Sequence, residues 1–213
     1  MEAIALDEMY KRIEQLCREA GVNVTTMCRE AGVPRSALSD YKAGRIKSLA
    51  ADKLAKIAGF LHDIGNLVNR VDHSQSGAVM AFRILDNMDC PPEEIATIVT
   101  AIGNHDEGTA FPVNAVAAAI ILADKTDVRR TRVRNRDKAT FDIHDRVNYS
   151  VERSEVLLDL PGRTVTLSLS INTEVCAVMD YFEIFLQRML LSRKAAETLD
   201  LKFRLEINGQ ILL

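Results

Sequence analysis

The chain contains four histidines, and three of them stand beside acidic residues in its middle part. The stretches that hold these residues are "LHDIGN", "HSQSGA", "IGNHDEG" and "ILADKTD", and the candidate ligands in them are His62, Asp63, His73, His105 and Asp124. Imidazole nitrogens and carboxylate oxygens suit a borderline or hard divalent cation. A single histidine at a helix end is usually a surface or capping residue. The set of five predicts a metal site.

Four helical segments must position these residues. Apolar side chains recur at helical spacing, and the segments are residues 48–65, 74–88, 91–105 and 114–130. Pro91 and Pro92 open the third segment, which is a position that proline tolerates. Each candidate ligand falls near an end of one of these segments. The spacing therefore predicts a helical domain in which helix ends supply the ligands.

The ligand blocks, in the order His-Asp, His, His and Asp, resemble the HD superfamily of metal-dependent phosphohydrolases over roughly residues 50–130. The resemblance implies that the five candidates bind one or two divalent ions (Mn, Fe, Mg, Co or Ni). It also implies a catalytic role for Asp63, which can bridge two metals. The activity expected is hydrolysis of a phosphoester, plausibly a nucleotide, by metal-activated water. The family supplies a further histidine from an earlier helix, and this chain has none before His62, which implies a one-metal or weakened centre.

Other charged residues follow the candidate ligands directly. Asp106 is expected to position a water molecule or an imidazole, or simply to cap a helix. Basic side chains after Asp124 are expected to bind the substrate phosphate, because guanidinium groups bind phosphate oxygens in pairs; they are Lys125, Arg129 and Arg130. Arginines recur at positions 132, 134 and 136. For these the alternative is a solvated basic loop or an interface with an acidic partner.

The amino-terminal part carries a different pattern. "NVTTMCREAGV" and "PRSALSDYKAG" predict two short helices joined by a glycine-bearing turn. Residues 8–58 resemble the helix-turn-helix of the Cro and phage-repressor type. The resemblance implies a DNA contact through the second helix and the turn after it, made by Arg35, Ser36, Ser39, Lys42 and Arg45. A homodimer is then expected, since one copy would bind weakly. The alternative is a helical subdomain that completes the metal-binding bundle or binds another protein.

The carboxy-terminal part reads as α+β. Residues 155–172 alternate apolar and polar side chains across a Pro-Gly turn and predict a β-hairpin. Residues 173–200 predict a long helix, and residues 201–209 a closing strand. The apolar stripe of the long helix, which includes Tyr181 and Phe185, is interpreted as core or as a dimer contact.

Composition limits the remaining possibilities. With 213 residues, 47% of them hydrophobic, the chain can form a sizeable core, and its net charge of −3 gives no general attraction to nucleic acid or to anionic membranes. We expect neither a membrane-spanning run nor a signal peptide, and therefore a cytoplasmic protein with no membrane partner. Four singly placed cysteines are expected to be ordinary thiols.

Together these patterns predict a mainly α protein. We expect a repressor-like head at 1–48, an HD-type helical bundle at 49–146 that shares its first helix with the head, and an α+β portion at 147–213. Two functions follow. The first is a phosphohydrolase that acts on a small phosphorylated substrate. The alternative is a DNA-binding transcriptional regulator in which the HD region is a sensor or is inactive.

Overall fold

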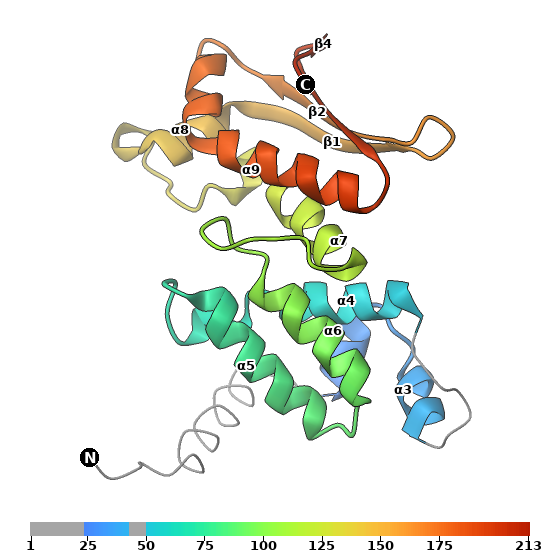
Figure 1. Ribbon diagram of the computed structural model, residues 1–213. Helices are drawn as coiled ribbons and strands as arrows, with labels where there is room; N and C mark the ends of the chain where they lie inside the picture. The colour runs from blue at the N-terminus through green and yellow to red at the C-terminus, as the bar shows by residue number, and fades with distance from the viewer. Residues whose placement is uncertain (1–23, 43–49) are drawn as a thin grey trace. The chain divides into compact units, whose positions relative to one another are not determined.

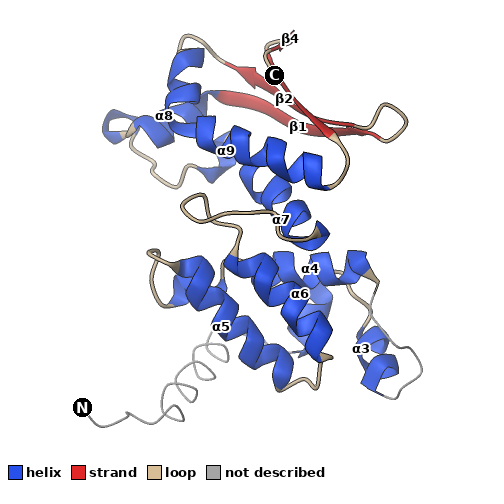
Figure 2. Ribbon diagram, viewed as in Figure 1, coloured by secondary structure: helices blue, strands red, loops and turns tan. Residues whose placement is uncertain are grey.

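The computed structural model describes residues 24–42 and 50–213, and it divides the chain into two compact units, residues 1–120 and 121–213 (Figure 1). Helices dominate, and one small sheet lies in the second unit (Figure 2). The prediction of a mainly helical chain with an α+β carboxy-terminal part is confirmed at this level. No helix in the described ranges has the length and apolarity needed to cross a membrane.

The first unit is built from helices whose ends match the sequence patterns. The described elements are α2 (Val24–Glu30), α3 (Arg35–Lys42), α4 (Ala51–Leu61), the 3₁₀ turn η1 (Ile64–Leu67), α5 (His73–Asp86) and α6 (Pro92–Gly103). Helix α7 (Ala115–Lys125) runs across the boundary between the units. The first helix expected in the head lies outside the described residues.

One apolar core serves the described part of the first unit. Helix α4 buries Ile57, Ala58 and Leu61 completely, and these side chains belong to the same cluster as Cys28 and Val33 from the α2–α3 region. Side chains of α5 and α6 complete that cluster. The helix expected to be shared by the head and the metal-binding pattern therefore contributes to a core that is common to both.

The turn between α2 and α3 is fixed by backbone hydrogen bonds. Val33 N donates to Cys28 O at 2.8 Å and Gly32 N donates to Arg29 O at 3.1 Å, which is the Schellman pattern that ends a helix. Gly32 has φ +61°, a conformation that costs little for glycine alone. Val33 and Cys28 are both buried, so the turn also closes on an apolar contact.

The second unit contains a four-stranded sheet. Its elements are η2 (Arg130–Arg132), η3 (Lys138–Thr140), α8 (Ile143–Ser150), β1 (Val151–Asp159), β2 (Thr164–Ile171), α9 (Val178–Thr198), β3 (Lys202–Ile207) and β4 (Gln210–Ile211). The strand order is β1-β2-β3-β4. The predicted hairpin pairs β1 with β2 antiparallel, and α9 crosses over so that β3 runs parallel to β2. Strand β4 was not predicted.

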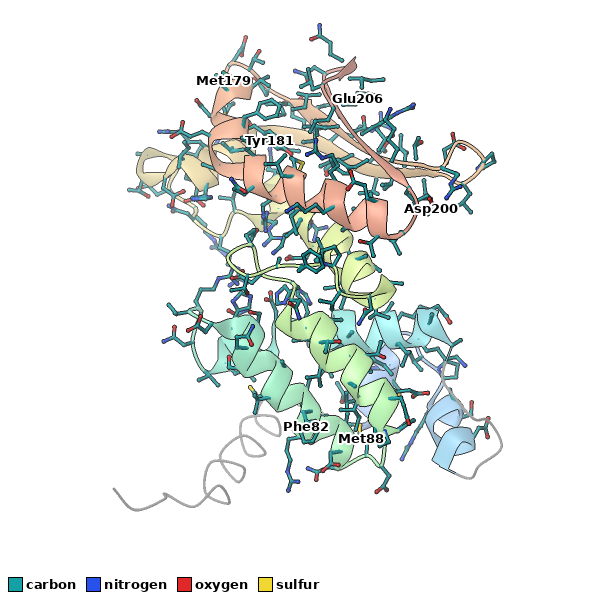
Figure 3. All side chains as sticks on the ribbon, viewed as in Figure 1. Phe82, Met88, Met179, Tyr181, Asp200 and Glu206 are labelled. Carbon is teal, nitrogen blue, oxygen red and sulfur yellow. The ribbon has the colours of Figure 1, made fainter. Side chains whose placement is uncertain are left out.

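The predicted stripe on α9 is core for part of its length. Tyr181, Phe185 and Met189 are buried and pack with the inward side chains of β2 and β3, and Tyr181 donates its hydroxyl to Met189 Sδ at 3.1 Å. Figure 3 shows Tyr181 on the ribbon of α9. Met179 is 74% exposed, so the stripe does not extend into the core at the start of the helix.

Gly32→Ala is predicted to destabilise the head, because the left-handed backbone costs an L-residue about 1–2 kcal/mol. Denaturation followed by circular dichroism measures this loss. Gly32→Asn is the matched variant and should lose less, since asparagine tolerates the conformation better. Equal stability of wild type and Gly32→Ala would contradict the turn geometry.

Candidate metal centre and helix-turn-helix head

Three helix ends of the first unit bring four of the five predicted ligands together. His62 and Asp63 follow the last turn of α4, His73 is the first residue of α5, and His105 lies two residues beyond α6. The rings of His62 and His73 each lie with their centroids 5.1 Å from that of His105, nearly perpendicular to it. We call His62, Asp63, His73 and His105 the histidine-aspartate cluster.

Each of the three imidazoles is held by a backbone carbonyl three residues earlier in the chain. The Nδ1 atoms of His62, His73 and His105 lie 2.7, 3.0 and 2.6 Å from the carbonyl oxygens of residues 59, 70 and 102. A carbonyl oxygen only accepts hydrogen bonds, so Nδ1 must carry the proton in all three rings. A ring that carries its proton on Nδ1 alone presents an Nε2 lone pair, which is one of the two tautomers through which histidines bind metals.

The Nε2 atoms face the carboxylate of Asp63 and one another. The distance from Asp63 Oδ1 is 3.3 Å to His73 Nε2 and 3.7 Å to His105 Nε2, and the distance from Asp63 Oδ2 to His62 Nε2 is 3.7 Å. His73 Nε2 and His105 Nε2 are only 3.2 Å apart. Two lone pairs at that distance repel, and a proton or a metal cation between them removes the repulsion.

The cluster is enclosed on one side and open on the other. His73 and His105 are buried, whereas the side chain of Asp63 is 50% exposed. Contact with His105 is the main cause that holds the pKa of the Asp63 carboxyl well below its usual range; the neighbouring imidazoles act in the same direction, against the burial that would raise it. The carboxylate is therefore ionised. His62, Asp63 and His105 each offer a ligand atom within 4.8 Å of the others, a set that fits a divalent cation.

Gly65 allows the turn that follows Asp63 to approach the start of α5, which carries His73. A Cβ atom at this position would overlap the carbonyl oxygen of His73 and would lie 2.6 Å from Gly77 N. The turn that follows Asp63 therefore lies directly against the first turns of α5. The glycines of "HDIG" and "SQSGA" permit this approach because neither has a side chain.

Of two further predicted residues, Asp106 lies at the edge of the cluster, whereas Asp124 belongs to the second unit. Asp106 Oδ1 lies 3.9 Å from His73 Nε2, at the edge of the cluster, which suits the predicted role beside an imidazole. Asp124 is in the second unit, near the end of α7. Its role as a fifth ligand stays a prediction.

The predicted phosphate-binding cations have other partners. The side chain of Lys125 is buried and its Nζ lies 2.6 Å from Asp124 Oδ2. Arg129 pairs with Asp127 at 2.8 Å. Arg130 donates from Nε to the carbonyl oxygen of Tyr149 at 2.7 Å and stacks on that ring. The exposed fraction of Lys125 is 2%; the role of these three residues as phosphate contacts stays a prediction.

One charged residue beside the cluster was missed in the sequence. Arg70 Nη1 lies 3.9 Å from Asp63 Oδ1, and the carbonyl oxygen of the same residue accepts from His73 Nδ1. Arg70 belongs to none of the ligand blocks. Its spacing of three residues from His73 concerns the backbone carbonyl only, so no sequence pattern pointed to the Arg70 side chain.

In the head, the second helix presents part of the predicted DNA-binding set. Arg35 and Ser36 are exposed at the start of α3, while Ala37 is buried against the core. Ser39 and Lys42 belong to α3, but their side chains lie outside the description, and Arg45 lies outside the described residues altogether. Residues 24–42 thus form a helix, a tight turn and a helix, as the pattern predicted.

Three of the four cysteines lie in the described ranges. Cys28, Cys90 and Cys176 are free thiols, and Cys17 lies outside the described residues. Burial raises the pKa of both Cys90 and Cys176 to about 11. These thiols stay protonated at neutral pH, as expected for ordinary packing residues.

Comparison with known proteins supports the helix-turn-helix assignment of the head. Residues 12–70 match the family of the Cro/C1-type HTH DNA-binding domain, a range that includes α2, α3, α4 and the His62–Asp63 doublet. The uncharacterized protein MJ1020 of Methanocaldococcus jannaschii is 32% identical over 108 residues, which are 47% of this chain and 41% of that protein. The chain thus spans less than half the length of this relative. No solved structure matches the chain.

Gly65→Ala is predicted to destabilise the first unit by about 1–3 kcal/mol, the usual cost of overpacking, and to separate His73 from Asp63. Chemical denaturation and the metal content of the purified variant measure both effects. The matched control is Gly59→Ala, where an added Cβ meets nothing within 4 Å. Unchanged stability and metal content in Gly65→Ala would contradict the close approach.

Proposed function

We propose that this chain is a DNA-binding regulatory protein that reads DNA with its amino-terminal head. The observation that carries the proposal is the match of residues 12–70 to the Cro/C1-type HTH domain, together with the helix-turn-helix formed by α2 and α3. In this class of domain the second helix enters the major groove. Arg35 and Ser36, exposed at its start, would contact base edges or phosphates there.

The charge of the chain limits how strongly one copy can bind. With a net charge of −3, the protein has no general attraction to the DNA backbone, and binding depends on local contacts. Two heads that read two half-sites would add their contacts. We therefore propose a homodimer on DNA, with affinity that falls steeply as salt rises.

Arg35→Ala is predicted to weaken DNA binding at least about tenfold, because it removes a charge-assisted contact. Fluorescence anisotropy with operator fragments selected from random DNA, measured at several salt concentrations, tests this. Arg153→Ala is the control, since Arg153 is exposed on β1 and pairs with Glu155 at 2.8 Å. Equal affinity and salt dependence in Arg35→Ala and wild type would count against α3 as the reading helix.

A second candidate function belongs to the histidine-aspartate cluster: metal-dependent hydrolysis of a phosphoester, of the HD type. The three fixed Nε2 lone pairs around Asp63 support it. A bound divalent ion lowers the pKa of its water ligand and neutralises charge on the phosphoryl group. Asp63 and the imidazoles would hold that ion, and Asp106 would accept a proton or orient a water at the edge of the site.

His105→Gln and Asp63→Asn are each predicted to lose bound Mn²⁺ or Fe²⁺, because each removes a ligand from a set of four. Elemental analysis of purified protein and calorimetric titration with Mn²⁺ measure the loss. His144→Gln is the matched control, since His144 lies exposed on α8 in the other unit.

Phosphatase and phosphodiesterase assays on the metal-loaded protein separate an enzyme from a sensor. Turnover that disappears in Asp63→Asn supports the hydrolase. Metal binding without turnover supports a regulator whose metal centre senses a ligand. A wild-type protein that takes up no metal would refute both roles of the cluster.

A further inference from the structure

We infer that Arg70 binds the phosphate of the substrate or ligand at the histidine-aspartate cluster. This inference rests on the metal-binding role proposed for that cluster. The ligand class is a small phosphorylated organic molecule. The predicted phosphate contacts of the second unit have other partners, whereas Arg70 lies directly beside the cluster.

The backbone of Arg70 is fixed while its side chain is accessible. The carbonyl oxygen accepts from His73 Nδ1 at 3.0 Å, so the residue cannot move without disturbing a ligand. The side chain is 70% exposed, and its Nη1 lies 3.9 Å from Asp63 Oδ1 and 3.4 Å from Asn66 Oδ1. In the part of the chain that the structure describes, its Nε and Nη2 have no hydrogen-bond partner.

A bound cation would change the net charge next to the Arg70 guanidinium. Without metal, Arg70 stands near an ionised carboxylate. Once a divalent ion binds Asp63, that negative charge is compensated, and the ion and the guanidinium become two neighbouring positive charges. An anion between them removes the repulsion. Phosphate fits this position because its oxygens can bind the metal and accept two parallel hydrogen bonds from a guanidinium.

Two other cations on nearby helices pair with carboxylates of their own helix. Lys56 pairs with Asp52 at 3.7 Å within α4, and Arg83 pairs with Asp86 at 3.6 Å within α5. Neither pair includes a residue of the cluster. Arg70 is therefore the cation that the first unit places closest to Asp63 among the ion pairs described.

Exposed apolar side chains lie close to Arg70 in the sequence, at the end of η1 and on the loop that follows it. Leu67, Val68 and Val71 are 43%, 57% and 71% exposed. Exposed apolar groups beside a charged residue suit a ligand that has an organic part next to its phosphate. The loop between η1 and α5 thus offers both a phosphate contact and an apolar edge, which favours a phosphoester over inorganic phosphate alone.

The test compares Arg70→Gln, Arg70→Lys and wild type after loading with Mn²⁺. Metal content comes from elemental analysis, inorganic phosphate affinity from calorimetry, and KM and kcat from p-nitrophenyl phosphate. We expect Arg70→Gln to keep its metal, to bind phosphate at least about tenfold more weakly and to show a KM at least about tenfold higher, as for the loss of a charge-assisted hydrogen bond. Arg70→Lys should recover part of the affinity, because it keeps the charge but not the paired donors.

Lys56→Gln is the control in the same unit and should bind phosphate as wild type does. Phosphate affinity that is unchanged in Arg70→Gln, in a protein that holds its metal, overturns the inference and leaves the proposed metal centre standing. A wild-type protein that binds no metal refutes the centre itself and the inference with it. Loss of metal in Arg70→Gln would also overturn it, by showing a role in assembling the cluster.

Discussion

The hydrogen bonds from three imidazole Nδ1 atoms to backbone carbonyls are the constraint on which the rest of the site depends. Each bond joins a histidine to the carbonyl three residues earlier, so the local backbone sets the tautomer and orientation of each ring. The lone pairs of Nε2 then have a fixed direction before any ligand arrives. Because helix ends supply these residues, the packing of α4, α5 and α6 sets the distances between them. A cation is the natural complement to this arrangement of acceptors around an ionised carboxylate.

The helix-turn-helix head and the cluster share a helix and a core. Helix α4 ends directly before His62, lies within the matched range 12–70, and buries Ile57 and Leu61 against side chains of the α2–α3 region. No linker lies between the two patterns in the sequence. A change at the cluster that shifts the end of α4 would act on the same packed side chains that support α3. Rigid interiors transmit such shifts, because their packing leaves few voids.

Much of this architecture could be predicted from the sequence, because helical periodicity and proline positions fix where helices begin and end. These signals placed His62, His73 and His105 at helix ends, and the turn around Gly32 between two short helices. They did not reveal the burial of Lys125 or the position of Arg70, since periodicity says nothing about which side chains pair across a fold. Strand β4 has two residues, too few to show alternation, and the parallel pairing of β2 with β3 depends on the crossover by α9.

The central claim is that the three imidazoles carry their protons on Nδ1 and present Nε2 to a cation. Histidine ¹⁵N NMR on uniformly labelled protein at neutral pH tests this most directly, with Zn²⁺ as a diamagnetic metal. The account predicts Nδ1–H signals for His62, His73 and His105 that persist on addition of Zn²⁺, while their Nε2 resonances shift and those of His144 do not. Nε2–H signals for these three rings, or Nε2 resonances that do not shift when Zn²⁺ is added, would contradict it.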